Sequence, residues 1–195
     1  MDRKEEILKI ADALFSSKGY HLSMADIANN VNIKVASIYS HYAGKDEIIL
    51  KVVENEIIGF YHFIMKEIEK MEDDCCEKKL KTLFFLIINY FSNDRLCFWK
   101  NISLIQNDKL RKTCRGMIEK RESVIGEVFN KIFQEGIDAE EIKYLNQQSI
   151  VLLYIATIKG ILDIIFISRD SDMNLQLSLE KIWNEYWFAI KNKRA

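Results

Sequence analysis

The residues of this chain best suited to chemistry form a short basic set with no acidic residue among them. Between Ile27 and Lys45 there is no aspartate or glutamate, although acids make up 29 of the 195 residues. Lys34, His41 and Lys45 carry, or can carry, positive charge in this stretch. A surface of this composition faces phosphate groups without repulsion. The alternative is a small helical hairpin whose lysines are solvated in the ordinary way.

Other chemistries find no supporting motif. The sequence has no glycine-rich phosphate loop, no nucleophile motif and no metal-ligand cluster, and His21, His41 and His62 are scattered. We therefore expect no enzyme, no metal and no cofactor. The four cysteines lack C-x-x-C spacing, so reduced thiols are the default expectation. A redox switch at the adjacent Cys75 and Cys76 is the less favoured alternative, because it requires exposed thiols of low pKa.

Two helices are predicted in the first part of the chain. The first ends before the basic stretch, and the second overlaps its start. Apolar residues recur at helical spacing over residues 5–18, and Gly19 follows as a C-cap, which predicts the first helix. Ser23 opens an S-x-x-D arrangement similar to a capping box, which predicts the start of the second helix. Asn32 tolerates a positive φ better than most residues, so it is suited to end that helix.

A third short helix completes the arrangement. It is predicted over about residues 35–42, and Ala43-Gly44 break the chain before a long helix begins at Lys45. Ile27 and Ile38 are expected in a small core. Two short helices joined by a tight turn make a helix-turn-helix, in which the second helix enters the major groove of DNA.

A longer pattern runs through these elements, from Ile7 to Leu50. It comprises Ala11, Leu14-Phe15, Gly19-Tyr20, Ser23-Met24, Ile27-Ala28, Ile38-Tyr39, His41-Tyr42 and Lys45. In order and spacing it resembles the N-terminal domain of the TetR family of transcriptional regulators. Asn32 stands where that family usually has glycine, and Lys34 stands near a position that usually holds a small hydroxyl residue. The turn is therefore expected to survive, while the base preference differs from that of close relatives.

The resemblance implies an all-α fold with two parts. Residues 1–47 form a helix-turn-helix DNA-binding domain of three helices, and residues 48–195 form a helical ligand-binding and dimerisation domain. The predicted DNA-binding residues are Ser23, Met24, Lys34, Val35, Ala36, Ser37, Tyr39, Ser40, His41 and Lys45. Of these, Tyr39 and His41 are expected to reach phosphates, and Lys45 to hold the DNA backbone at the start of the next helix. A place in the small core is the alternative for Tyr39.

The rest of the chain also predicts helices, about nine in all. The segments are 45–70, 77–91, 96–106, 109–134, a helix that an Asp138–Glu141 cap opens and that ends near residue 168, and a last helix that ends near residue 191. Gly136 is expected to end the fourth of these segments, and residues 170–173 to separate the last two. C-terminal domains of the family vary in sequence, so ligand residues do not transfer by resemblance.

A dense aromatic set marks the candidate ligand pocket. Its members are Phe84, Phe85, Tyr90, Phe98, Trp99 and Tyr154. Such rings can line a pocket between helices for a small, largely apolar effector, and the alternative is that they are plain core. The polar Asn101 and Tyr154 either orient a ligand or satisfy a buried backbone group.

The last two long helices are apolar on more than one side. The apolar residues between Ile150 and Ile165 cannot all face one core stripe, so a second buried surface is expected. We expect a homodimer through these helices, with Gly160 allowing close helix approach and with Ile158 and Trp183 at the interface. A membrane surface is the alternative.

Together these patterns predict a regulator of transcription. The net charge of -1 predicts no strong nonspecific field, and the charged start of the chain without an apolar signal core leads us to expect a soluble, cytoplasmic protein. The hypothesis is a homodimeric repressor that binds a palindromic DNA operator and is released by the effector. The alternative is a DNA-binding regulator controlled by thiol oxidation or by a protein partner.

Overall fold

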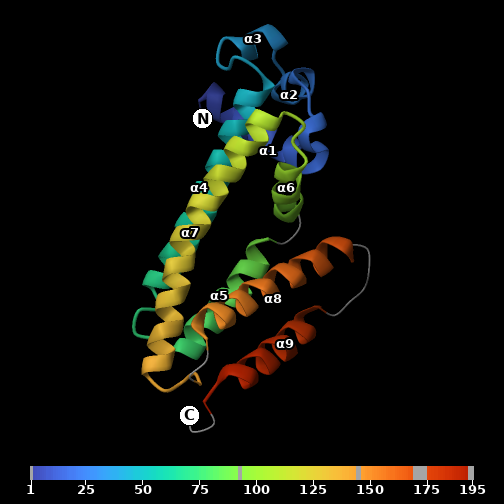
Figure 1. The fold of residues 1–195 in the computed structure, drawn as a ribbon. Coiled ribbons are helices and arrows are strands. Elements are labelled where there is room, and N and C mark those ends of the chain that lie inside the picture. The colour runs from blue at the N-terminus through green and yellow to red at the C-terminus, as the bar shows by residue number, and fades with distance from the viewer. Residues whose placement is uncertain (1, 92–93, 144–145, 169–174, 193–195) are drawn as a thin grey trace. The chain divides into compact units, whose positions relative to one another are not determined.

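The computed structural model of the chain describes residues 2–91, 94–143, 146–168 and 175–192. The helices in these residues are α1 (Arg3–Lys18), η1 (Gly19–His21), α2 (Met24–Val31), α3 (Val35–Tyr39), α4 (Lys45–Glu69), α5 (Cys76–Tyr90), α6 (Asp94–Ser103), α7 (Asp108–Asp138), α8 (Gln147–Ile167) and α9 (Leu175–Ile190) (Figure 1). The only extended pairing in the described part is an isolated bridge between Ile142 and Lys191. The predicted all-α class is confirmed.

Packing divides the chain into two compact units. Unit 1 consists of Met1–His62 and Ser92–Glu122, and unit 2 consists of Phe63–Phe91 and Ser123–Ala195. The long helices α4 and α7 each contribute residues to both units. The boundary predicted after residue 47 separates a DNA-binding part from a ligand-binding and dimerisation part. These packing units do not test that division, so it stays a prediction.

Unit 1 is organised around α1. Ile7, Ala11 and Phe15 follow one another at steps of four residues, so they share one face of the helix, and all three are buried. The ring of Phe15 meets Phe98 of α6 edge-on, with 5.0 Å between the ring centroids. Helix α1 also packs against α2, which in turn contacts α3. It therefore links the helix-turn-helix to α6.

Unit 2 has an aromatic core to which α5, α7, α8 and α9 contribute rings. Phe84 of α5 lies 5.7 Å from Trp183 of α9 and 6.4 Å from Tyr154 of α8, measured between ring centroids. All three side chains are buried. The hydroxyl of Tyr154 donates to the carbonyl oxygen of Leu80 at 2.8 Å, so the buried polar group is satisfied.

The predicted end of α7 at Gly136 is wrong. The helix continues to Asp138. A Cβ added at Gly136 would lie 2.5 Å from the Sγ of Cys76 and 2.9 Å from the Cδ1 of Ile142. The glycine therefore allows a close approach within unit 2 and does not terminate the helix.

The predicted Asp138–Glu141 cap is also wrong. Helix α8 begins at Gln147, where the side chain of Asn146 accepts a hydrogen bond from the backbone nitrogen of Ser149 at 2.9 Å. The carboxylate of Glu141 instead accepts from the backbone nitrogens of Cys76 and Glu77, at 3.2 and 3.3 Å. Glu141 thus caps the start of α5 from outside that helix. The predicted break at residues 170–173 lies outside the described residues.

Candidate nucleic-acid interface

Local hydrogen bonds fix both ends of α2. The Oγ of Ser23 accepts from the backbone nitrogen of Asp26 at 3.1 Å, and the carboxylate of Asp26 accepts from the backbone nitrogen of Ser23 at 2.8 Å. These two bonds form the predicted capping box. Asn32 ends the helix with φ 56° and ψ 47°, the left-handed conformation expected of it. The start of α2 and its terminating turn are confirmed.

The charge at this cap is held by a neighbouring helix. The ammonium of Lys18 lies 2.6 Å from the carboxylate of Asp26. The hydrogen bond from Lys18, followed by those from the hydroxyl and backbone nitrogen of Ser23, lowers the pKa of Asp26 to about 2. The carboxylate that caps α2 is therefore ionised throughout the physiological range.

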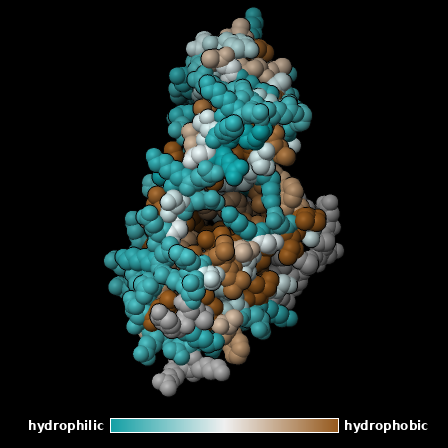
Figure 2. All heavy atoms as spheres, in the orientation of Figure 1, coloured by the Kyte–Doolittle hydropathy of each residue, from teal (hydrophilic) through white to brown (hydrophobic). Residues whose placement is uncertain are grey.

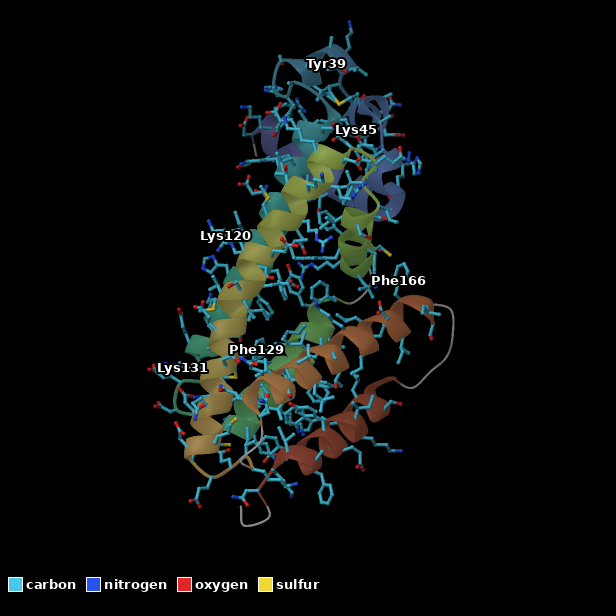
Figure 3. The ribbon with its side chains drawn as sticks, viewed as in Figure 1. Tyr39, Lys45, Lys120, Phe129, Lys131 and Phe166 are labelled. Carbon is cyan, nitrogen blue, oxygen red and sulfur yellow. The ribbon has the colours of Figure 1, made fainter. Side chains whose placement is uncertain are left out.

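Helix α3 shows almost all of its side chains to solvent. It spans Val35–Tyr39, shorter than the predicted 35–42, and Ile38 is its one fully buried residue. The exposed residues of this segment are Lys34, Val35, Ala36, Ser37, Tyr39 and Ser40. Tyr39 is 55% exposed, so it does not belong to the small core (Figure 3). The predicted DNA-binding residues from Lys34 to Ser40 therefore lie together on, or directly beside, one exposed short helix.

The polar side chains in and beside this helix differ in whether they already form hydrogen bonds within the protein. The hydroxyl of Ser40 donates to the carbonyl oxygen of Ser37 at 2.7 Å. Within the described part of the chain, neither the ammonium of Lys34 nor the hydroxyl of Tyr39 has a hydrogen-bond partner. Lys34 and Tyr39 can therefore donate to an approaching ligand. Ser23 differs from them, because its hydroxyl belongs to the α2 cap.

Lys45 is held against η1. Its ammonium donates to the carbonyl oxygen of Tyr20 at 2.8 Å and lies 3.9 Å from the centroid of the Tyr20 ring. A lysine has three donors, so further donors remain beside the one that Tyr20 accepts. The structure assigns Lys45 a positioning contact, and its phosphate contact stays a prediction, as do the contacts of the half-buried Met24 and His41.

Sequence reasoning missed a network that holds the start of α4. The hydroxyl of Tyr20 donates to one carboxylate oxygen of Asp46, and the side-chain nitrogen of Asn107 donates to the other, both at 2.8 Å. Partial burial, followed by the hydrogen bond to Asp46, raises the pKa of Tyr20. Asn107 also accepts from the backbone nitrogen of Leu110 at 3.1 Å, as a cap of α7. Its position before a predicted helix was the one available signal.

A second missed contact joins α6 to the end of α1. The side-chain nitrogen of Asn101 donates to the carbonyl oxygens of Phe15 and Ser16, at 2.8 and 3.1 Å. Gly19 follows with φ 58°, and a Cβ there would lie 3.0 Å from the side-chain oxygen of Asn101. Of the two roles predicted for Asn101, satisfaction of backbone groups is therefore the observed one.

The predicted ligand residues fall into different packing environments. Phe84, Phe98 and Tyr154 are buried and make ring contacts within their own units. Tyr90 stacks on Phe63 with 5.5 Å between centroids, and Phe85 lies edge-on to Phe84 at 5.3 Å. Of the six predicted residues, Trp99 is found at the wall of a described cleft. A ligand role for the others stays a prediction.

The cysteines and acids offer little further chemistry. Burial is the main cause that raises the pKa of Cys76 to about 12 and that of Cys114 to about 11, which opposes formation of their thiolates. Cys75 is exposed. Among the described residues, no three His, Cys, Asp or Glu side chains are grouped to hold a metal ion.

Sequence comparisons match the helix-turn-helix segment. The family model described as bacterial regulatory proteins, tetR family, matches residues 7–52. A stretch of 64 residues is 45% identical to the biofilm operon icaADBC HTH-type negative transcriptional regulator IcaR of Staphylococcus epidermidis, and it covers 32% of this chain and 35% of that protein. The chain thus matches about a third of the length of this curated relative.

Solved structures share the fold over nearly the whole chain. A putative transcriptional regulator from Saccharomonospora viridis, in complex with choline, has a TM-score of 0.81 at 16% identity and is covered over 98% of its length by 97% of this chain. FadR from Bacillus subtilis, in complex with stearoyl-CoA, has a TM-score of 0.69 at 19% identity, over 94% of this chain and 97% of that one. The helix-turn-helix segment, residues 7–52, thus has the sequence of the tetR family of bacterial regulatory proteins, and the helical fold that continues beyond it is the one seen in these solved regulators.

Proposed function

We propose that the chain is a homodimeric transcriptional repressor that binds a palindromic operator through α3. The observation that carries this proposal is the exposed, acid-free surface of α3, from Lys34 to Ser40, on a helix-turn-helix whose turn and caps are intact. Phosphate contacts supply affinity and base-edge contacts supply sequence preference. The IcaR relative is named as a negative regulator, which supports repression as the direction of control.

Selection of bound DNA from a pool of random sequences tests the DNA-binding role and identifies the operator at the same time. We expect the purified chain to enrich an inverted repeat. Lys34→Ala should lose about 1–3 kcal/mol of binding free energy on that sequence and much less on random DNA, because a base-edge contact is sequence-specific. Lys70→Ala is the matched control, since Lys70 is an exposed lysine remote in sequence from α3. Enrichment of no sequence would refute the proposed role.

The dimer proposal rests on the outward face of α8. Leu153, Ala156, Gly160, Ile164 and Ile167 recur every three or four residues and are all exposed. Residues at this spacing form one stripe along a helix. Figure 2 shows apolar side chains at the surface over α8, whereas the surface over the helix-turn-helix is mostly hydrophilic. A stripe of this kind is stable in water once another apolar surface covers it.

A second protomer is the occupant that we infer for this stripe. Apart from the adjacent residues and the nearby backbone of α8 itself, no described atom of the protomer lies within 4 Å of a Cβ added at Gly160, so packing within one chain does not require glycine there. Glycine is expected where two helices of different protomers approach closely. Exposed Phe188 of α9 adds to the same proposal that the last two helices form the interface.

A membrane is the weaker candidate for this surface. Helix α8 is long and apolar enough to cross a bilayer, with a mean hydropathy of 2.3, and 28% of the stretch is buried in the protomer. However, the exposed Lys159 and Asp163 lie within it. Ionisable side chains in the middle of a span are unfavourable, whereas they are tolerated near the edge of a protein interface.

The assignment of Ile158 and Trp183 to the centre of this interface is corrected by their burial. Ile158 is 5% exposed and Trp183 is 1% exposed, so both belong to the core of the protomer and a charge there would unfold it. Leu153→Glu is the appropriate test, with the exposed Leu104→Glu as its control. Sedimentation should show a monomer for the Leu153 variant and a dimer for the control. A dimer in both variants would remove α8 from the interface.

Control by a small effector is the third part of the proposal. Structural neighbours were solved with choline and with stearoyl-CoA, which supports a ligand-responsive fold. Thiol oxidation is the alternative, and the buried Cys76, whose pKa is raised, disfavours it at that residue. Mass spectrometry of the purified protein under native conditions, with and without peroxide treatment, separates the two. A copurified ligand supports effector control, whereas loss of operator binding on oxidation without any ligand supports the alternative.

A further inference from the structure

A cleft between α6 and α7 in unit 1 combines positive charge with an apolar wall. Its volume is about 480 Å³, within the roughly 300–1,000 Å³ that is usual for small-molecule sites. It is lined by Trp99, Ile102 and Ser103 of α6 and by Arg111, Lys112, Arg115 and Ile118 of α7. Among these described lining residues there is no acid.

We propose that this cleft binds an organic anion with an apolar body, such as a medium-chain carboxylate. The cations of α7 hold the anionic head, and Trp99 and Ile102 hold the apolar body. The proposal that this anion is the effector rests on the proposed function, whereas the binding itself does not.

The three cations are unequally engaged. The guanidinium of Arg111 donates to the carbonyl oxygen of Ile105 at 2.6 Å and pairs with Asp108. The Nε of Arg115 donates to Glu119 at 2.8 Å. Lys112 has no ion-pair partner among the residues that the structure describes.

This inequality favours an anion over a cation as ligand. Arg111 is held in place, so its charge is present in the cleft without further ordering of the side chain. Lys112 is exposed and supplies donors for charge-assisted hydrogen bonds to a carboxylate. A cationic ligand would meet the ammonium of Lys112, which has no ion-pair partner among the described residues, and no acid among the residues that line the cleft.

The apolar wall is also preformed. The indole nitrogen of Trp99 donates to the carboxylate of Glu56 at 3.2 Å, and its ring lies edge-on to Phe60 with 5.6 Å between centroids. Ile102 is 4% exposed and closes the wall. An apolar chain placed in the cleft therefore meets a fixed indole ring and leaves water behind.

Each helix that lines the cleft carries or directly follows an asparagine that holds a helix of the DNA-binding segment. On α6, Asn101 precedes the lining Ile102 and bonds the end of α1. On the α7 side, Asn107 bonds Asp46 at the start of α4. A ligand that changes the spacing of α6 and α7 therefore changes the spacing of these two asparagines. Operator and anion would then weaken the binding of each other by the same factor.

Calorimetry on the purified full chain with four probes of one chain length tests recognition of the anion. We expect decanoate and decyl sulfate to bind, and decanol and decyltrimethylammonium to bind far more weakly. Comparison of the first two distinguishes a carboxylate preference from general recognition of anions. Equal affinity for all four probes would overturn the proposal.

Two matched variants test the role of the cleft cation. Lys112→Glu should weaken decanoate binding about tenfold or more, the loss expected for a charge-assisted hydrogen bond. Lys109→Glu makes the same charge change at an exposed lysine of α7 that does not line the cleft, and it should leave the affinity unchanged. An equal loss in both variants would indicate a long-range charge effect and would contradict the site.

Tryptophan emission locates the ligand. A decanoate brominated at its terminal carbon should quench part of the emission of the native chain, and Trp99→Phe should remove that quenching. Quenching that persists in the variant would place the ligand elsewhere and overturn the proposal. Operator binding measured in the same samples keeps the two proposals apart. A chain that binds operator but not decanoate refutes the cleft alone, and a chain that binds decanoate but no DNA refutes the proposed function alone.

Discussion

The helix-turn-helix and helix α8 present opposite kinds of outward surface. On α3 a single side chain, Ile38, is fully buried, and the exposed ones are mostly small or polar. On α8 the protomer buries Ile150, Tyr154 and Ile158, while Leu153 and other apolar residues remain outside. The outward face of α3 is stable in water as it stands, and that of α8 is not. This difference matches the two partners proposed above, DNA for α3 and a second protomer for α8.

The two regions also differ in what holds them. Bonds between residues three apart, such as those of Ser23 with Asp26, fix the start of α2. The core of unit 2 depends on rings from separate helices, such as Phe84, Tyr154 and Trp183. Substitution of a surface side chain leaves such local bonds in place, whereas substitution of one ring in the core removes contacts with several helices. Four predictions test this comparison.

Truncation of the unit 2 core should have the largest effect. Trp183→Ala is expected to lower the free energy of unfolding by about 3–5 kcal/mol, because it leaves a cavity among rings. Leu153→Ala removes a half-exposed side chain and should leave protomer stability within about 0.5 kcal/mol. Urea denaturation at several protein concentrations separates protomer stability from dimer stability. Similar losses in both variants would mean that α8 does not have distinct inner and outer faces.

Two glycines should respond to alanine with opposite signs. Gly136→Ala places a Cβ against Cys76 and should destabilise the protomer by about 1–3 kcal/mol. Gly160→Ala meets open space, so it should raise the stability of the monomeric protomer by up to about 1 kcal/mol through helix propensity. The same change should weaken the dimer. Measuring both variants in the Leu153→Glu background isolates the protomer term, and a loss at Gly160 there would contradict the assignment.

Loss of the α2 cap should have a smaller effect. Ser23→Ala removes the side-chain acceptor for the backbone nitrogen of Asp26, and the expected loss of stability is about 1 kcal/mol. Ser17→Ala is the control, because its hydroxyl bonds a carbonyl oxygen within α1 and caps no helix. Thermal unfolding gives the comparison. A loss for Ser17→Ala as large as that for Ser23→Ala would show that the cap is not special.

The smallest effect is the response of this cap to pH. The pKa of Asp26 is lowered to about 2 from its ordinary value of 3.8, so its ionised form is favoured in the folded chain. The stability contributed by this carboxylate is fully present above pH 3.8 and is lost as pH falls through about 2. Carbon-detected NMR titration of Asp26 measures it directly. A midpoint near 3.8, or one unchanged in Lys18→Met, would reject the ion pair as the cause.

Local patterns predicted the N-terminal elements well. The capping box at Ser23, the left-handed Asn32 and the start of α4 at Lys45 all occur where the sequence indicates them. Each depends on residues within one or two helical turns of one another. The DNA-binding set on α3 came from the family resemblance, and the sequence left a core place for Tyr39 as the alternative; in the structure only Ile38 of this helix is fully buried.

Contacts between distant residues account for the errors. Glu141 caps a helix that starts 65 residues earlier, and Gly136 makes room for Cys76 of that helix, so neither role is visible in its own neighbourhood. The cleft that contains Lys112 arises from two helices whose relative position no local pattern encodes. Trp183 looked like an interface residue because hydrophobicity indicates burial and not which surface provides it.

The contact between Lys45 and Tyr20 has a consequence for side-chain entropy. A free lysine loses up to about 2 kcal/mol of rotamer freedom when it is fixed. Lys45 is already restrained by the carbonyl oxygen and ring of Tyr20, whereas Lys34 is exposed without such a restraint. In the proposed complex a phosphate at Lys45 would meet an ammonium whose ordering accompanied folding, and a base at Lys34 would have to order the side chain on binding. The phosphate contact of Lys45, which does not depend on DNA sequence, would therefore cost little side-chain entropy. The base contact of Lys34, which does depend on sequence, would cost more.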